Sequence, residues 1–309
     1  MTLLAILELI LAFTAAAFLL FLIIATVVCV KLLFFTRNQT YQESMDILAQ
    51  KGTLYTDALS ADKLECVHIV GANGTPLTGY YANLFPESKK VVVLVHGIRA
   101  NHIIGLQYSP LFIPHGYNLL AIDQRAHGLS GGRLSTYGYY EKTDLAAWLD
   151  YLRKRLGKDC EIGLMGHSMG AATVLNCPEL DHNIRFIVAD CPFDLLKDFL
   201  LYQLRMLGFL AHPVYGLLRL VTRLLWGFDP NVVTPGLIAC TAGRDIPTLF
   251  IHSKGDRIIP YICAQRMFEA RGNPHDRLYI HDTAAHPDVY ASDREMYRKS
   301  VDEFLSNIS

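Results

Sequence analysis

The chain has 309 residues and a formal net charge of -1, with 51% hydrophobic and 18% charged residues. This length accommodates one large α/β domain and an accessory segment without requiring a second domain. Because acidic and basic residues nearly balance and form no block of like charge, the composition excludes the electrostatic surface that binds nucleic acid. The apolar content is high for a soluble enzyme, and its excess lies near the amino terminus.

Leu9 to Val30 form an apolar run that is interrupted by two threonines, with Glu8 before it and Lys31 after it. As an α-helix, these residues extend roughly 33 Å, which matches the hydrocarbon core of about 30 Å in a bilayer. The run predicts a transmembrane helix within an anchor of residues 1–36, and therefore a membrane as a partner.

A cleaved signal peptide is the alternative for this run. Such peptides begin with a positively charged region and end at a cleavage site of small residues. The first thirty residues contain no Lys or Arg, and no cleavage pattern follows, so the sequence favours the anchor. Lys31 and Arg37 lie on the carboxyl flank and Glu8 on the amino flank. The positive-inside rule then predicts a single-pass protein whose catalytic domain is cytoplasmic.

Residues 37–60 are polar and mixed, and they predict a juxtamembrane linker or short helix before a globular domain at 61–309. That domain opens with two β-rich runs, Leu64 to Val70 and Leu77 to Leu84. Gly71-Ala72-Asn73-Gly74 separates them and supplies residues that tolerate positive φ, so an antiparallel hairpin is expected.

The rest of the domain alternates short apolar runs with helix-length segments. Runs of this kind are typical of strands buried on both faces, and their alternation with helices predicts a mostly parallel sheet with helices on both sides. The expected strands are Val91–Val95, Asn118–Ile122, Cys160–Met165, Ile184–Ala189, Thr248–Ile251 and Leu278–Ile280. The expected helices are Asn101–His115, Tyr139–Leu156, Met169–Cys177, Tyr261–Arg271 and Asp288–Ser306.

An insertion at about residues 193–244 separates two of these strands by more chain than a simple crossover needs. Two apolar helices are expected within it, Leu195 to Leu210 and Val214 to Phe228. The second carries Arg219 and Arg223 on one face. It either packs its apolar side on the core of the protein or touches a bilayer as a basic amphipathic helix.

Gly166-His167-Ser168-Met169-Gly170 follows one predicted strand and opens a helix, which is the setting of a nucleophile elbow. In such a turn the residues that flank the serine are crowded, and glycine avoids the clash. A five-residue pattern of this kind arises by chance often enough that it needs partners elsewhere in the chain.

A serine nucleophile needs a base and an orienting carboxylate, in the chain order Ser, Asp or Glu, His. His275, His281 and His286 come late enough, and His286 lies in the loop after the last strand, so it is the predicted base. Asp256 ends the run after the preceding strand and is the predicted acid. The fallback acids, after an earlier strand, are Asp190 and Asp194.

An oxyanion hole needs two backbone N–H groups near the nucleophile. The strand Val91–Val95 runs into His96-Gly97-Ile98, and the N–H groups of Ile98 and Met169 are the expected donors. Gly97 lets this loop turn over the nucleophile, and His96 is expected to be a structural hydrogen-bonding residue.

One further segment, Asp123 to Ser130, reads Asp-Gln-Arg-Ala-His-Gly-Leu-Ser. With the motifs above, it resembles the α/β-hydrolase superfamily over about residues 60–307. The similarity is to esterases and lipases related to monoacylglycerol lipase and to serine aminopeptidase-like hydrolases. The resemblance implies the α/β-hydrolase fold, with the insertion as a helical cap over the site and no cofactor. Its implied triad and oxyanion donors are Ser168, Asp256, His286, Ile98 and Met169. Ala126 departs from the glycine usual in this loop.

These features predict a serine hydrolase that cleaves a carboxylic ester of a small, apolar, lipid-like or aryl substrate through an acyl-enzyme on Ser168. A thioesterase, a peptidase or amidase, and an acyltransferase need the same residues and stay open. A membrane-tethered binding protein on a hydrolase scaffold is the alternative outside enzymes. The seven cysteines show no paired or zinc-ligand spacing, so no metal is expected, and the sequence makes no prediction of oligomeric state.

Overall fold

The computed structural model describes residues 2–35, 37–55 and 63–308. Its centre is an eight-stranded sheet with the order β1-β2-β4-β3-β5-β6-β7-β8. Among the described strands, only β2 runs antiparallel to both of its neighbours, so the expected hairpin and mostly parallel sheet are confirmed. The strands are β1 (Leu64–Val70), β2 (Pro76–Ala82), β3 (Lys90–Val95), β4 (Asn118–Ile122), β5 (Glu161–His167), β6 (Phe186–Asp190), β7 (Thr248–Ser253) and β8 (Arg277–His281).

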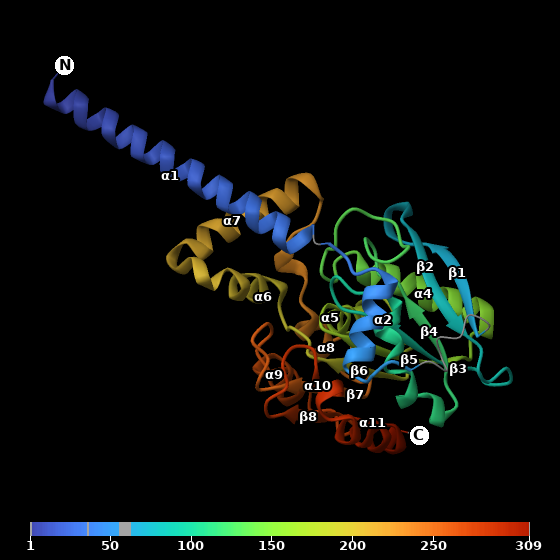
Figure 1. Ribbon diagram of the computed structural model, residues 1–309. Helices are drawn as coiled ribbons and strands as arrows, with labels where there is room; N and C mark the ends of the chain where they lie inside the picture. Colours follow the sequence, from blue (N-terminus) through green and yellow to red (C-terminus); the bar gives the residue numbers. More distant parts are fainter. Residues whose placement is uncertain (1, 36, 56–62, 309) are drawn as a thin grey trace.

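Helices cover both faces of this sheet (Figure 1). Alternate side chains of β3 point to opposite faces, so Val91 and Val93 pack with Trp148, whereas Val92 and Leu94 pack in a second core. Both faces of the strand are buried, which explains its unbroken apolar sequence. The helices around the sheet are α3 (His102–Leu106), α4 (Glu141–Leu156), α5 (Met169–Asn176), α9 (Ile262–Arg271), α10 (Val289–Ser292) and α11 (Arg294–Ile308).

Two expected helices are interrupted. The helix expected over 101–115 ends at Leu106, and two short 3-10 turns follow it, each with a proline in its first turn. Pro110 and Pro114 lack the N–H that would continue an α-helix. The helix expected over 288–306 divides into α10 and α11 at Asp293, whose φ of -147° and ψ of 77° are not helical.

The amino-terminal helix α1 (Leu3–Phe34) has 32 residues and is therefore longer than the predicted span. By length and composition it is able to cross a membrane, as is a second stretch, Leu196–Leu225. It projects away from the sheet (Figure 1), and its first buried residue is Leu22. The short helix α2 (Tyr41–Gln50) follows it, while the predicted boundary between linker and domain, at 60 and 61, lies outside the described residues.

The insertion between β6 and β7 contains α6 (Leu196–Gln203), the 3-10 segment Leu204–Leu210, α7 (Ala211–Leu225) and α8 (Pro235–Cys240). The prediction of one helix over 195–210 is wrong because Gly208 has a φ of 56° and a ψ of -128°, which breaks the helical path. For the same reason the apolar stretch from α6 to α7 is not one continuous helix. We call α6, this 3-10 segment and α7 the cap. In Figure 1 the cap lies beside the carboxyl-terminal part of α1.

Candidate active site

Ser168 occupies the sharp turn between β5 and α5. Its φ of 55° and ψ of -122° are unusual for a residue with a side chain, and conformations of this kind cluster at functional sites. The Ser168 N–H donates to the carbonyl oxygen of Asp190 over 2.8 Å, which ties the turn to the neighbouring strand β6. The turn is therefore strained but held in place by the sheet.

The two glycines of the pentapeptide are required by close backbone contacts. A Cβ on Gly166 would lie 2.3 Å from the carbonyl oxygen of Gly170, and a Cβ on Gly170 would lie 2.1 Å from that of Val95. Real Cβ atoms do not approach oxygen so closely, and backbone atoms cannot move aside as side chains do. Both glycines are therefore required because α5 packs closely against β5 at Gly166 and against β3 at Gly170.

The side chains of Ser168, His286 and Asp256 form a hydrogen-bonded relay. Ser168 Oγ lies 2.8 Å from His286 Nε2, and His286 Nδ1 lies 2.6 Å from Asp256 Oδ2. Because a carboxylate can only accept, Nδ1 carries the proton and Nε2 is free to accept the serine hydroxyl proton. The structure therefore brings together the three side chains predicted as the triad.

Asp256 is held by the chain around it. The N–H groups of Ile258 and Ile259 both donate to its Oδ1 over 2.8 Å. Burial alone would raise the pKa of this carboxyl, but hydrogen bonds from His252 and His286 outweigh burial and hold the pKa well below its ordinary value. Asp256 is consequently ionised at neutral pH and able to orient the imidazole.

His252 was not singled out from the sequence. Its Nε2 lies 3.2 Å from Asp256 Oδ2 and 3.0 Å from the carbonyl oxygen of Ile259. His252 therefore helps to hold the Asp256 carboxylate in place. Its Nδ1 is buried without a hydrogen-bond partner among the described residues. A histidine four residues before the acid was the available signal, but only the turn after β7 brings the two side chains together.

The loops that carry Asp256 and His286 touch each other. A Cβ on Gly255 would lie 2.3 Å from the carbonyl oxygen of Thr283, so only glycine permits this approach. Nδ1 of His281, at the end of β8, accepts the N–H groups of Thr283 and Ala284 over 3.1 and 2.9 Å. His281 therefore shapes the loop that carries His286. It came late enough in the chain to be a candidate base, but its role in the structure is to support this loop.

The fallback acids lie in other networks. Asp190 Oδ2 accepts hydroxyl groups from Tyr297 and Tyr108 over 3.0 and 3.3 Å. Burial raises the pKa of Asp190 to about 7, although the two hydrogen bonds from the tyrosines act to lower it. Asp194 lies at the start of the insertion, and its Oδ2 is 4.0 Å from a guanidinium nitrogen of Arg266. Of the three candidate acids, Asp256 is the one hydrogen-bonded to His286. The remaining histidine, His275, is exposed.

The turn after β3 lies against the nucleophile. A Cβ on Gly97 would be 3.2 Å from Ser168 Cβ, and the Gly97 N–H donates to His167 Nε2 over 3.1 Å. His96 Nε2 accepts the N–H of Gln124 over 3.0 Å, which is the structural role expected for it. Burial lowers the pKa values of His96 and His167 to about 3, so both rings stay neutral and accept these bonds.

The Asp123 to Ser130 segment supports the same turn. His127 Nε2 accepts the N–H of Arg99 over 3.0 Å, and Arg99 has a positive φ of 66°. Ala126, where the resemblance leads one to expect glycine, has a φ of 60°. The N–H of Ala126 donates to the Gly131 carbonyl oxygen over 2.7 Å, and this bond helps to hold the residue in its conformation. The loop thus keeps its shape despite the substitution.

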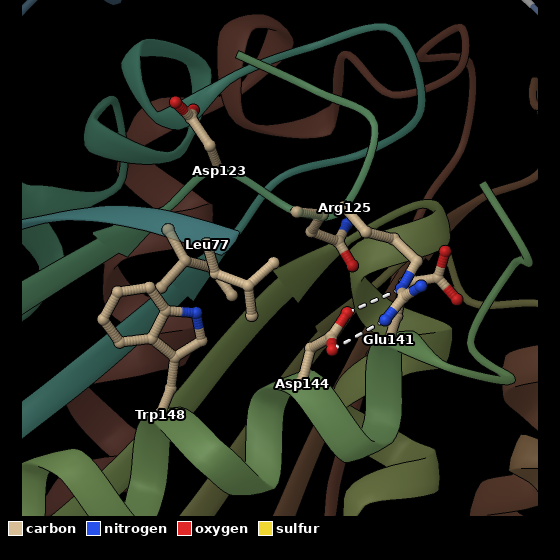
Figure 2. Close-up of a pocket in the computed structure, with 8 residues that line it drawn as sticks. Leu77, Asp123, Arg125, Glu141, Asp144 and Trp148 are labelled. Atoms are coloured by element: carbon tan, nitrogen blue, oxygen red, sulfur yellow. Dashed lines mark hydrogen bonds and ion pairs between the residues drawn. The ribbon is translucent and has the colours of Figure 1, made fainter. Parts of the chain in front are cut away.

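A buried ion pair fixes the base of that segment. Figure 2 shows Arg125 pointing at Asp144 of α4, and the two are joined by bonds of 2.6 and 2.8 Å. The Asp144 carboxylate also accepts the Ala72 N–H over 2.7 Å, which connects the β1–β2 turn to the same pair. Removing either charge would leave its partner buried and unpaired. This pair is a structural support for the site.

Two cavities border the residues around the relay. One, of about 230 Å³, is mainly apolar and has Phe193, Phe199 and Ile259 in its wall. The other, of about 560 Å³, has charged as well as apolar groups in its wall, where Lys254 and Arg257 lie with His286. Ile98 and Met169, whose N–H groups were the predicted oxyanion donors, have side chains in the apolar cluster that also contains Phe193 and the cap. The site therefore has a mainly apolar side and a side that carries charged groups.

One group of described residues has the spacing that a metal ion needs. Donor atoms of Cys191, Asp256 and His286 lie within 4.8 Å of one another. Two of these residues are already joined by the 2.6 Å relay bond, and burial raises the pKa of the Cys191 thiol well above its ordinary value. A metal ion would have to replace the relay bond, so the donor set fits proton transfer better than metal binding.

Comparisons with known proteins agree with this architecture. A family model for the α/β-hydrolase fold matches residues 90–231. The uncharacterized protein YqkD of Bacillus subtilis is 34% identical over 247 residues, covering 78% of this chain and 79% of YqkD. The uncharacterized protein YfhR of Escherichia coli is 23% identical over 253 residues, covering 78% of this chain and 80% of YfhR.

Solved structures show the same fold. The esterase Pf2001 of Pyrococcus furiosus is 25% identical, with a TM-score of 0.63 over 79% of this chain and 90% of that one. Est1E of Butyrivibrio proteoclasticus, solved with ferulic acid bound, is 19% identical, with a TM-score of 0.59 over 78% of this chain and 98% of that one. With its eight-stranded sheet, its elbow and these relatives, the chain belongs to the α/β-hydrolase family.

Proposed function

We propose that this protein is a serine esterase that cleaves a carboxylic ester of an apolar acyl or aryl substrate through an acyl-enzyme on Ser168. The observation that carries the proposal is the relay of 2.8 and 2.6 Å from Ser168 through His286 to Asp256. The similarity to the esterase Pf2001 supports ester hydrolysis as the reaction class.

In the first half-reaction, Ser168 Oγ attacks the ester carbonyl carbon and its proton passes to His286 Nε2. Asp256, ionised because of its lowered pKa, stabilises the imidazolium that forms. The tetrahedral intermediate then collapses, the bond to the leaving oxygen breaks, and His286 returns the proton to the departing alcohol. In the second half-reaction His286 takes a proton from water, which attacks the acyl carbon. The bond to Ser168 Oγ then breaks, Oγ takes the proton back from His286, and the acid is released.

The N–H groups of Ile98 and Met169 stabilise the oxyanion. Met169 is the first residue of α5, so the positive end of the helix dipole adds to its N–H. A Cβ on Gly97 would lie 3.2 Å from Ser168 Cβ, and this closeness supports the placement of the Ile98 turn beside the nucleophile. In other hydrolases, loss of one such donor lowers the rate by about 10² to 10³.

The substrate places its acyl or aryl group on the apolar side of the site. Support comes from the cavity walled by Phe193, Phe199 and Ile259, and from the resemblance to monoacylglycerol lipase-related enzymes. The leaving alcohol faces the cavity beside His286, whose wall carries Lys254 and Arg257. A lipid-like ester suits this arrangement because one end is apolar and the other hydrated.

The helix α1 anchors the enzyme in a membrane, with the catalytic domain in the cytoplasm. Support comes from the length of α1, from its apolar composition and from the basic residues at its carboxyl end, Lys31 in its last turn and Arg37 beyond it. Protease digestion of sealed right-side-out vesicles tests the orientation, since residues 37–55 are expected to be cleaved only after the vesicles are opened. Cleavage in intact vesicles contradicts it.

The reaction is tested with the full-length protein in detergent. We expect a fluorophosphonate to label the protein and a panel of esters of increasing acyl length to be hydrolysed. Ser168→Ala abolishes both activities, whereas Ser306→Ala, which removes an exposed hydroxyl of α11, leaves both unchanged. Preference for a thioester or amide over every ester contradicts the substrate class. No labelling and no turnover of any substrate favours a binding protein on a hydrolase scaffold.

A further inference from the structure

The cap presents apolar side chains to its surroundings. Met206 and Phe209 are 88% and 84% exposed, and Leu224 and Leu225 are 72% and 71% exposed. With Leu220, these residues form what we call the cap apolar surface. Single exposed apolar residues are common on proteins, but here five large ones lie on two consecutive elements of the cap, the 3-10 segment and α7, and we read that concentration as an interaction site.

The cap apolar surface adjoins the helix α1. Leu22, Val30 and Phe34 of α1 are buried in the same apolar cluster as Val214 and Leu218 of α7. The ring of Phe34 contacts Trp226, just after α7, with the centroids 5.4 Å apart. Figure 1 shows α7 beside the carboxyl-terminal part of α1, while the first half of α1 stands free. The cap and the end of α1 are thus one packed unit.

This packing sets the depth of the cap relative to the bilayer. The apolar run of α1 is bounded by Glu8 and Lys31, so Leu22 to Val30 belong to the half of the membrane nearer the catalytic domain. These are the residues that pack on the cap. The opposite side of α1 there is exposed and apolar, with Ile24 and Val27 at 54% and 56%. Both surfaces require an apolar neighbour at the same depth.

We propose that the cap apolar surface is seated in the near leaflet of the bilayer that α1 spans, and that the apolar ester reaches Ser168 from that leaflet. The proposal rests on the proposed membrane anchor. Arg205 and Arg223 are exposed on the cap and Lys31 is exposed in the last turn of α1, and exposed cations beside a membrane attract anionic headgroups. The occupant of the surface is therefore a lipid surface with anionic headgroups.

The apolar cluster connects the leaflet with the site. It contains Phe34 of α1, Leu218 of the cap, and Met169, which adjoins the nucleophile. Tyr137, in the same cluster, donates its hydroxyl to the Leu33 carbonyl oxygen over 2.6 Å and so joins the end of α1 to the catalytic domain. The cavity walled by Phe193, Phe199 and Ile259 belongs to this same cluster, so it is the apolar space that would receive an acyl chain leaving the bilayer beside the cap.

The seating is tested by fluorescence without any use of catalysis. Full-length Phe209→Trp and Val70→Trp variants are reconstituted in phosphatidylcholine–phosphatidylglycerol vesicles with brominated acyl chains. Val70 is the matched control because it is also exposed but lies on β1, at the far edge of the sheet (Figure 1). Both variants keep the same native tryptophans. We expect a several-fold larger loss of the added fluorescence for Phe209→Trp. Equal losses in protein that floats with the vesicles overturn the proposal.

A kinetic measurement tests the route of the substrate. Met206→Asp combined with Phe209→Asp should lower kcat/KM several-fold for an ester dissolved in vesicles and leave kcat/KM for a short water-soluble ester unchanged. Val70→Asp should change neither value. An equal effect on both esters overturns the route. If the parent protein does not float with vesicles, the membrane anchor is wrong, and the seating that rests on it is overturned too. If Phe209→Trp is quenched but no ester is turned over, only the proposed esterase function is contradicted. The anchor, the seating of the cap and the esterase function therefore give distinguishable failures.

Discussion

The carboxyl edge of the sheet and the cap differ in how closely they are packed and in what they expose. At the edge, Ser168, His286 and Asp256 each have a hydrogen-bond partner, and a Cβ on Gly166 or Gly170 would collide with backbone. In the cap, a helix breaks at Gly208, and large apolar side chains are exposed. The edge therefore specifies the chemistry, whereas the cap is suited to contact with an apolar substrate and its source.

After loss of the nucleophile itself, the largest expected effect is at the acid. Asp256→Asn should lower kcat by about 10⁴ with little change in the fold, because an amide does not hold His286 in the same tautomer. Asp190→Asn is the matched control, since its carboxyl contacts Tyr108 and Tyr297 and does not touch the imidazole. Steady-state kinetics on one ester measure both. A loss at Asp190 as large as that at Asp256 would reassign the acid.

The crowding of the edge is tested by adding one methyl group. Gly170→Ala should destabilise the protein by about 3 kcal/mol or prevent its folding, because the new Cβ would lie 2.1 Å from the Val95 carbonyl oxygen. Denaturant unfolding in detergent measures the loss. A stable and active Gly170→Ala protein would show that the elbow has room that the structure does not contain.

The neutral histidines of the edge predict an acid-dependent stability. The folded pKa values of His96 and His167 are lowered to about 3, whereas unfolded histidine titrates near 6.5. Between these values the unfolded chain binds the extra protons. These two histidines should therefore lower the free energy of unfolding as the pH drops, by up to about 1.4 kcal/mol per pH unit each, while Asp190, whose pKa is raised to about 7, offsets part of this fall. Urea unfolding at pH 7 and pH 5 measures it, and equal stabilities at the two values would contradict the burial of both rings.

The smallest expected effect is in the cap. Gly216 is exposed on α7, and a Cβ there meets no atom within 4 Å. Gly216→Ala should leave ester hydrolysis unchanged and raise the free energy of unfolding by about 0.5 to 1 kcal/mol, because alanine restricts the unfolded chain and favours helix. Thermal unfolding in detergent measures the change. Destabilisation at this position would mean that the cap is packed as closely as the edge.

The residues of the relay were accessible to sequence reasoning because local signals place each of them. Ser168 is marked by its glycines, while Asp256 and His286 follow β7 and β8 directly. Since the carboxyl ends of parallel strands meet at one edge, chain order alone predicts that such residues approach one another. The sheet was predictable for a related reason, because each strand is a short apolar run.

The supports of the site were not predictable in the same way. His252, His281 and His127 act on backbone or side chains that tertiary folding brings to them, and their places in the sequence do not reveal these partners. The breaks at Pro110 and Pro114 did have a local signal, since proline ends a helix. The packing of α1 on the cap had no local signal, because the free and the packed halves of α1 are both apolar in sequence.

The central claim is that Ser168 carries the acyl group during turnover. Rapid quenching of full-length protein with a chromogenic ester, followed by mass spectrometry of its peptides, tests this claim most directly. We predict one acyl group on the peptide that contains Ser168, formed before steady state and absent from Ser168→Ala. Ester hydrolysis without a covalent adduct, or with the adduct on another residue, would contradict the account.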